Sequence, residues 1–230
     1  YYPNPMNIAS NLASAGWTKP WMITEFGHKG TWMSVPKTSF GTLVEETSTE
    51  KAASYREIYE KAVLANRDNG CLGSFAFVWG YQNHGEVLTW YGLFDKDGNS
   101  FAAVDELQYF WTGRYPEMRA PVIADRSAAL MNGKKADDSV VVSAGSENSA
   151  SVEASSPCGS PLKYRWMIYQ EGTASPDGSL PDGLGGLFED ETLPEVRFRA
   201  PSAAGNYRLC VFVTDGNHKA ASAVIPFCVK

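Results

Sequence analysis

Glu25 is the residue of this chain best suited to carry out chemistry, because it ends a short apolar run. The run 21–23, Trp-Met-Ile, is typical of a buried strand, and Glu25 follows at its carboxyl end with Gly27 and Gly30 just beyond. In parallel α/β architectures that end of a strand holds its last residue rigidly, while the following loop is free to vary. Glu25 is therefore a candidate reacting group. The alternative is a strand-end glutamate that forms a salt bridge or faces water.

The overall composition excludes several classes of function. The chain has 230 residues, 43% of them hydrophobic and 20% charged, which is typical of a folded protein. The net charge is −6, and no run of lysines or arginines could neutralise a row of phosphates, so nucleic-acid binding is disfavoured. No stretch approaches the roughly 20 apolar residues of a membrane span. Seven tryptophans and eleven tyrosines, many of them in loops, favour flat ligands such as sugars, although core roles for these residues are commoner.

The cysteines do not point to a metal site. Cys71, Cys158, Cys210 and Cys228 show neither CxxC nor Cys/His spacing, and we predict no metal and no cofactor. Cys71 lies in an apolar run and is most simply a small buried residue. The other three leave one disulfide plus one free thiol open, so the cysteines do not decide the compartment.

The pattern of the first half predicts alternating helices and strands around Glu25. Thr47 and Glu50 match a capping box, which predicts that a helix begins there. The run 71–79 is apolar without alternation, which predicts a strand covered on both faces. Strand, long helix and strand form a βαβ unit. The predicted elements are a helix over 6–16 closed by Gly16, the strand ending at Glu25, a loop over 28–46, a helix over 49–68, a strand over 71–79, a loop over 80–98 and a helix over 100–112.

Beyond about residue 121 the pattern changes to short alternating segments. Strands are predicted over 139–144, 150–154, 162–169, 195–199, 206–214 and 220–229, with a long Gly/Pro/Asp-rich loop over 170–188. The segment 215–218 joins the last two strands as a hairpin. This pattern favours an immunoglobulin-like β-sandwich over 121–230, as a second domain after a first domain over 1–120.

Three segments of the first half resemble a known enzyme clan. The segments 19–27 (Lys-Pro-Trp-Met-Ile-Thr-Glu-Phe-Gly), 73–80 (Gly-Ser-Phe-Ala-Phe-Val-Trp-Gly) and 91–98 (Tyr-Gly-Leu-Phe-Asp-Lys-Asp-Gly) are similar to the last part of a retaining (β/α)8-barrel glycoside hydrolase. The clan includes β-glucuronidases, β-galactosidases and endoglucanases. The resemblance covers roughly residues 1–115. It implies a fold made of the last two βα units of a (β/α)8 barrel, followed by the immunoglobulin-like β-sandwich.

The resemblance also assigns roles to individual residues. It gives Glu25 the position of the nucleophile and Trp79, at the end of the next strand, the position of a sugar-binding platform; the alternative for Trp79 is a core residue. A tyrosine that contacts the nucleophile is matched by Tyr1 or Tyr2, of which we select Tyr2. Four loop residues at the same predicted end of the barrel are further candidates for substrate binding: His28, Trp32, Asn83 and Trp90. For His28 the alternative is a plain surface histidine.

One part of the catalytic machinery has no counterpart in this sequence. Retaining hydrolysis uses two carboxyl groups about 5–5.5 Å apart. The resemblance places the second in an Asn-Glu pair, which this chain does not contain, and Glu86 is a poor substitute because it follows the later strand. A whole barrel also takes about 250 residues. We therefore expect a C-terminal fragment that is inactive alone and that is completed by the missing N-terminal part of the barrel.

The resulting hypothesis is a carbohydrate-active enzyme fragment. The intact protein would hydrolyse poly- or oligosaccharides through a glycosyl-enzyme intermediate on Glu25, and the resemblance to polysaccharide hydrolases implies a secreted, periplasmic or cell-surface location. The rival hypothesis is a non-catalytic carbohydrate-binding or structural module. It would need aromatic residues on the sandwich, but the only tryptophan in 121–230 is Trp166, which the pattern places in a strand core.

Overall fold

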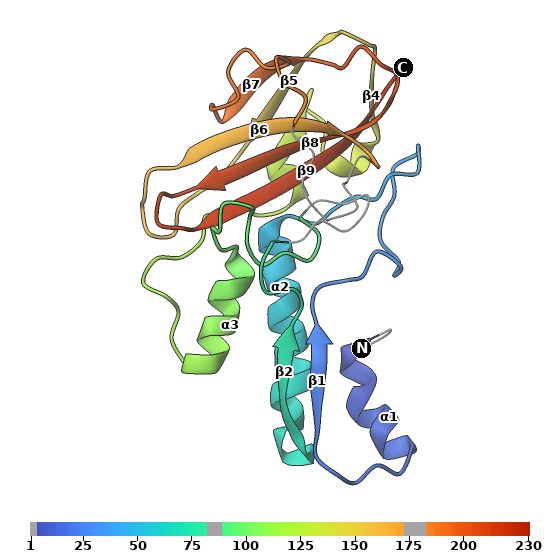
Figure 1. Cartoon of the computed structure of the whole chain (residues 1–230), viewed down its shortest axis with the longest axis vertical. Coiled ribbons are helices and arrows are strands. Elements are labelled where there is room, and N and C mark those ends of the chain that lie inside the picture. Colours follow the sequence, from blue (N-terminus) through green and yellow to red (C-terminus); the bar gives the residue numbers. More distant parts are fainter. Residues whose placement is uncertain (1–3, 82–88, 173–182) are drawn as a thin grey trace.

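The structure is a computed structural model, which describes residues 4–81, 89–172 and 183–230. It is elongated, with helices and two parallel strands at one end and a β-rich body at the other (Figure 1). We call residues 4–120 the first region and residues 121–230 the second region. Each region has a hydrophobic cluster of its own, one around Ile23 and Tyr55 and one around Trp166 and Leu209, and a smaller cluster packs Phe101 of the first region against β6, β8 and β9.

Two parallel strands and the helix between them form the centre of the first region. Strand β1 (Trp21–Phe26) pairs with β2 (Cys71–Ala76). Helix α2 (Ser48–Ile58) begins with the predicted capping box, in which Glu50 N donates to Thr47 Oγ1 at 3.1 Å and Thr47 N donates to Glu50 Oε2 at 2.8 Å. The helical path continues as a π turn (Tyr59–Val63) and a 3-10 turn (Leu64–Asn69), so the long predicted helix consists of three segments.

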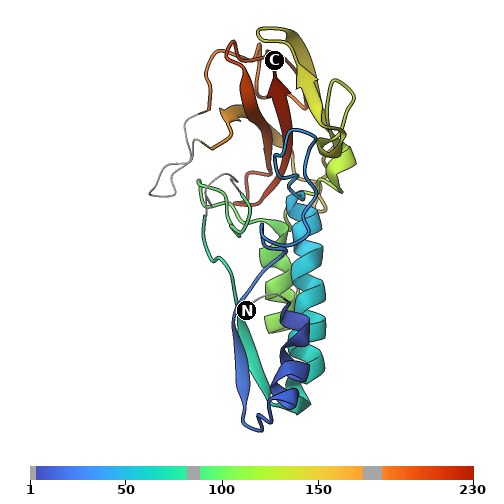
Figure 2. The ribbon, with the colours of Figure 1, turned by 90° about the vertical axis from the view of Figure 1, so that its right-hand side faces the viewer.

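Two further helices accompany the parallel strands. A 3-10 turn (Pro5–Asn7) leads into α1 (Ile8–Ser14), and α3 (Ala102–Thr112) packs against α2. Figure 2 shows the helices on one side of the β1–β2 sheet. One face of the two-stranded sheet is therefore covered by helices.

The second region consists of two sheets packed on a common core. The three-stranded sheet has the order β3-β5-β7 and is antiparallel, whereas the four-stranded sheet has the order β4-β9-β8-β6 and is mixed, because β4 runs parallel to β9. The strands are β3 (Ala129–Met131), β4 (Val140–Val142), β5 (Glu147–Val152), β6 (Lys163–Gln170), β7 (Glu195–Arg199), β8 (Gly205–Thr214) and β9 (Ala220–Val229). The predicted hairpin between the last two strands is confirmed.

Buried polar contacts join the two regions. Arg208 on β8 is fully buried; its Nη1 lies 3.8 Å from Glu45 Oε2, and its Nη2 donates to Leu43 O at 3.1 Å. At the β8–β9 hairpin, Lys219 Nζ lies 2.5 Å from Asp105 Oδ1 of α3. The backbone N–H of Ser222 donates to Ser48 Oγ, at the start of α2. These contacts attach the four-stranded sheet to α2, α3 and the loop before α2.

The predicted fold class is wrong. The described residues contain three separate sheets and three α-helices. The only parallel sheet in that part of the chain has two strands, and the other two sheets are antiparallel and mixed, so the described residues give no evidence of a (β/α)8-barrel fragment. The predicted immunoglobulin-like sandwich is also not supported, since its larger sheet is mixed. The domain boundary after residue 120 stays a prediction.

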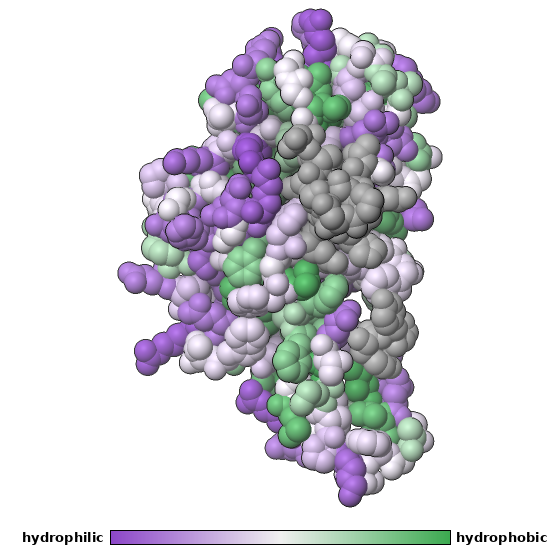
Figure 3. Space-filling view, in the orientation of Figure 1, coloured by the Kyte–Doolittle hydropathy of each residue, from purple (hydrophilic) through white to green (hydrophobic). Residues whose placement is uncertain are grey.

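The prediction that the strand 71–79 is covered on both faces is wrong, because the outer face of the β1–β2 sheet is exposed. Leu72 is 67% exposed and Phe75 61%, and Met22 on β1 is also exposed. Figure 3 shows hydrophobic side chains gathered over this part of the molecule. None of the described helices is both long and apolar enough to cross a membrane.

Candidate functional site

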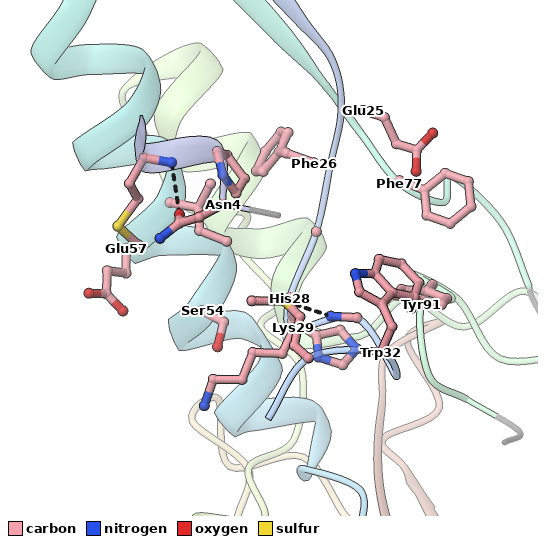
Figure 4. A pocket seen from close by; sticks show the side chains of 16 residues that line it. Asn4, Glu25, Phe26, His28, Lys29, Trp32, Ser54, Glu57, Phe77 and Tyr91 are labelled. Atoms are coloured by element: carbon pink, nitrogen blue, oxygen red, sulfur yellow. Dashed lines mark hydrogen bonds between the residues drawn. The ribbon is translucent and has the colours of Figure 1, made fainter. Parts of the chain in front are cut away.

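Glu25 lines a cavity of about 210 Å³ at the carboxyl end of β1. Aromatic side chains from two parts of the chain share its wall: Trp32 from the loop after β1, and Phe77 and Tyr91 from beyond β2. Figure 4 shows the Glu25 carboxylate beside the Phe77 ring, with Trp32 and Tyr91 below them. The cavity thus combines a carboxylate with flat apolar rings.

An irregularity in strand pairing directs Glu25 toward solvent. Between the pairs Ile23↔Ser74 and Phe26↔Ala76, β1 advances three residues while β2 advances two. Such a bulge re-aims side chains at the end of a strand. Ile23 and Phe26 are buried, whereas Thr24 and Glu25 between them are both exposed. The carboxylate is therefore accessible, while its neighbours anchor the strand in the core.

The turn after β1 requires glycine because other groups approach it closely. A Cβ at Gly27 would lie 2.8 Å from Phe77 O and 3.0 Å from Tyr55 Oη, and the Tyr55 hydroxyl donates to Phe77 O. Burial raises the pKa of the Tyr55 hydroxyl far above its ordinary value, so this donor stays protonated. A Cβ at Gly30 would collide with the Trp32 ring, which folds back over it. The two glycines allow the cavity wall to close around Glu25.

His28 is buried under the cavity. Its Nε2–H donates to Trp90 O, and its ring packs against the Trp90 and Tyr91 rings at centroid distances of 5.5 and 5.6 Å. Burial, with a smaller effect of the Lys51 charge, lowers the pKa of His28 to about 3. The imidazole is therefore neutral at physiological pH and braces the loop from inside.

Further contacts hold the loop after β1 against residues 89–91. Trp90 Nε1 donates to Lys29 O at 2.9 Å, and Thr31 N donates to Tyr91 Oη at 3.2 Å. Thr89 Oγ1 and Lys51 Nζ both reach the buried Glu45 carboxylate, at 2.5 Å. This buried network connects the cavity wall to helix α2.

The described lining of the cavity contains one other carboxylate, that of Glu57 on α2. Its oxygen lies 2.6 Å from Lys61 Nζ, and the hydrogen bond from Lys61 lowers the pKa of the Glu57 carboxyl. Figure 4 shows Glu57 across the β1 ribbon from Glu25. A group that must donate a proton needs a raised pKa, so Glu57 is not suited to be the acid partner of Glu25.

The structure brings together some of the predicted site residues and separates others. Glu25, His28 and Trp32 line one cavity, but His28 does so from a buried position. Trp79 is not part of this lining. It is 57% exposed, and its ring lies 5.2 Å from Phe94 and 6.2 Å from Trp111.

Trp90 is 2% exposed and acts as a support for the loop rather than as a cavity wall. Tyr2 and Asn83 lie outside the described residues, as does Glu86. Phe77 and Tyr91 were not predicted. The apolar run 71–79 ends in Phe77 and Trp79, and either of these aromatic residues could have reached the carboxyl end of the sheet.

The described residues hold no cluster of three or more His, Cys, Asp or Glu side chains that could bind a metal. The four cysteines are all unpaired, so the disulfide that the sequence left open does not form. Asp95 belongs to a turn: its Oδ1 accepts from Asp97 N at 3.0 Å and from Asn99 N at 2.8 Å. The described site therefore combines the exposed Glu25 carboxylate with aromatic rings, and its other carboxylate, that of Glu57, is paired with Lys61.

Comparison with known proteins adds little to this geometry. No protein family model matches the chain, and no curated protein matches it. One similar solved structure is a nucleoside hydrolase-related hypothetical protein from Saccharophagus degradans that is associated with carbohydrate metabolism. The match has a TM-score of 0.35 and 19% sequence identity, and it covers 55% of this chain and 29% of that one. At that TM-score the likeness carries no argument about fold or function.

Proposed function

We propose that this chain is the nucleophile-bearing part of a retaining β-glycoside hydrolase that acts on poly- or oligosaccharides. The observation that carries the proposal is the position of Glu25, an exposed carboxylate at the end of a parallel strand in a cavity walled by aromatic rings. Aromatic faces stack on the apolar faces of sugar rings, and a rigidly held carboxylate can attack a carbon atom.

The reaction would take place in two displacements. In the first, a Glu25 oxygen forms a bond to the anomeric carbon, and the bond from that carbon to the leaving oxygen breaks as the oxygen receives a proton from an acid. In the second, water attacks the same carbon, gives up a proton to the same residue and releases Glu25. The first displacement inverts the anomeric carbon and the second inverts it back, so the configuration is retained.

The second carboxyl group would come from polypeptide beyond this chain. The lining in the described part offers only Glu57 besides Glu25, and Glu57 is paired with Lys61. The exposed apolar residues on the outer face of the β1–β2 sheet support the same proposal, since parallel strands are ordinarily covered on both faces. We propose that the polypeptide covering this face supplies the acid/base, and that the chain alone is inactive.

The test is covalent trapping of the nucleophile in the complete polypeptide. Activated 2-deoxy-2-fluoro-β-glycosides of several sugars should label the enzyme, and peptide mass mapping should place the label on Glu25. Glu25→Gln should abolish labelling, whereas Glu57→Gln, which changes the other carboxylate of the same cavity, should retain it. A label on any other residue would refute the assignment.

A chemical rescue experiment separates a nucleophile from a structural carboxylate. Glu25→Ala should lose turnover of an activated aryl glycoside, and added azide should restore it by attacking the anomeric carbon from the vacated side. The expected product is an α-glycosyl azide. If a folded Glu25→Ala variant keeps hydrolysing the glycoside without azide, Glu25 does not act as the nucleophile.

A further inference from the structure

A second cavity lies at the amino-terminal ends of β1 and β2, on the side of the first region remote from Glu25. It has a volume of about 620 Å³ and is formed where α1 leads into β1 and where the 3-10 turn Leu64–Asn69 leads into β2. We call it the Trp17 cavity. We propose that it is a saccharide-binding site, separate from the Glu25 cavity, in which the Trp17 ring stacks on the apolar face of a sugar.

The backbone holds Trp17 firmly in place. Helix α1 ends at Ser14 and is followed by Ala15 and Gly16, whose φ of +71° is left-handed. Gly16 N donates to Ala13 O at 3.0 Å, and Trp17 N donates to Leu12 O at 2.9 Å. This pair of bonds is the Schellman motif of a helix C-terminus. A backbone fixed in this way loses little conformational freedom when the side chain that it carries binds a ligand.

The helix terminus does not by itself explain a tryptophan. A Schellman motif is commonly completed by an apolar contact from the residue after the glycine to the last turn of the helix, and a leucine or valine at position 17 could make such a contact. Trp17 keeps 52% of its surface exposed, so about half of the side chain is not used by the fold. An exposed indole beside a cavity, on a backbone that is held in place, is an arrangement suited to stacking on a sugar.

The opposite wall of the Trp17 cavity is rigid as well. Trp21 N donates to Gly70 O at 3.0 Å, and Trp21 Nε1 donates to Asn69 O at 3.1 Å. These two bonds fix both the backbone and the ring of Trp21, so the cavity is preformed by contacts within the fold. Its volume falls within the range of roughly 300–1,000 Å³ found for small-molecule sites.

The polar groups in the lining indicate which ligand fits. Ser10 and Thr18 contribute hydroxyl groups, and Lys19 and Asp68 contribute one charge of each sign. An anion would face Asp68 and a cation would face Lys19, whereas an uncharged polyhydroxylated ligand can hydrogen-bond to both. The outer face of the β1–β2 sheet, in contrast, exposes mainly apolar side chains. The combination of indole rings with hydroxyl and charged groups therefore favours a neutral sugar.

Affinity electrophoresis of the full chain tests the proposal. Native gels containing mixed-linkage β-glucan, xylan or galactomannan should retard the wild-type chain in at least one case. Oligosaccharides of that polymer should then quench its tryptophan fluorescence with saturation. Trp17→Ala should weaken the association by at least about tenfold, and Trp17→Phe, which keeps a ring, by less.

Trp111→Ala is the matched control, because Trp111 is an equally exposed tryptophan (51%) on α3. It should be retarded like the wild type, and so should Glu25→Gln, because the Trp17 cavity does not depend on the candidate nucleophile. Unchanged thermal unfolding of Trp17→Ala would show that the loss is one of binding. The proposal is overturned if no gel retards the wild type, if Trp17→Ala is retarded equally, or if Trp111→Ala loses retardation too. None of these results affects the labelling of Glu25.

Discussion

The two regions of this protein differ in how completely they bury their apolar side chains. The structure describes eleven exposed large hydrophobic residues, of which eight lie in the first region and only Val141, Leu184 and Leu193 in the second. In the second region, β8 and β9 form ten consecutive pairs and are almost wholly buried. The first region contains a two-stranded parallel sheet with one uncovered face.

This difference suggests that the second region supports the fold, whereas the first region exposes the surfaces that can bind ligands. Antiparallel and mixed sheets packed face to face complete their own core, whereas a parallel pair needs material on both faces. Both candidate ligand sites, the Glu25 cavity and the Trp17 cavity, lie in the first region. The second region attaches to this region through Arg208 and Lys219. We therefore expect stability to be concentrated in the second region and binding in the first.

The largest expected effect tests this contrast in burial directly. Trp166 on β6 is 2% exposed, and its Nε1 donates to Leu193 O at 2.9 Å. Trp166→Ala should lower the free energy of unfolding by about 4 kcal/mol, because it leaves a large cavity and an unpaired carbonyl. Phe75→Ala, at a residue 61% exposed on β2, should change it by less than about 0.5 kcal/mol.

Urea unfolding followed by circular dichroism measures both variants. A loss of more than about 2 kcal/mol for Phe75→Ala would contradict the contrast. It would mean that the outer face of the β1–β2 sheet is covered in solution, for example by a second copy of the chain, and light scattering of the wild type would then show the larger particle.

A somewhat smaller effect tests the connection between the regions. Arg208→Ala should lower the free energy of unfolding by about 3 kcal/mol, because it removes the buried partner of the Glu171 carboxylate and leaves Glu45 with Lys51 as its remaining charged partner. The value lies at the low end for buried pairs because Glu171 is partly accessible to solvent. Lys61→Ala is the control: its ion pair with Glu57 is exposed and should contribute less than about 0.5 kcal/mol.

If both variants have the same small effect, Arg208 does not contribute to the connection, which then depends on the contacts of Lys219 and Ser222 and on apolar packing. Amide hydrogen exchange of residues 43–51 tests the contact between Arg208 and the loop before α2 locally. Those amides should exchange faster in Arg208→Ala than in the wild type, because Arg208 Nη2 also donates to Leu43 O.

The sequence predicted local structure well where a single signal determines it. The pattern of alternation located β7 and β9 with their observed bounds, and the pair Thr47 and Glu50 located the start of α2. The short strand β3 was missed, because three residues carry too little alternation to be recognised. Local signals of this kind extend over a few residues and do not depend on the rest of the fold.

The arrangement of the site depended on contacts that the sequence does not reveal. Glu25 could be selected from its place after an apolar run, but the bulge that exposes it results from the pairing of β1 with β2. His28 and Trp90, both predicted to bind substrate, are buried against each other by a contact that spans 62 residues. The apolar run 71–79 was read as a strand covered on both faces, and nothing local distinguishes that case from the exposed face observed.

The smallest expected effect concerns His28, which is buried in the first region and holds the loop after β1 against Trp90. In the unfolded chain its pKa is near 6.5, whereas burial lowers it to about 3 in the folded protein. Between these pH values the unfolded state binds the extra proton, so stability is lost as the pH falls. Between pH 7.5 and pH 5 the titration of His28 should lower the free energy of unfolding by about 2 kcal/mol.

The variant His28→Gln can still donate to Trp90 O but cannot titrate. Its free energy of unfolding should therefore fall by about 2 kcal/mol less than that of the wild type over the same pH interval. Urea unfolding of both proteins at the two pH values isolates this residue, because all other groups titrate in both. Parallel pH profiles would mean that His28 is accessible to solvent, and the loop after β1 would then be as open as the outer face of the sheet.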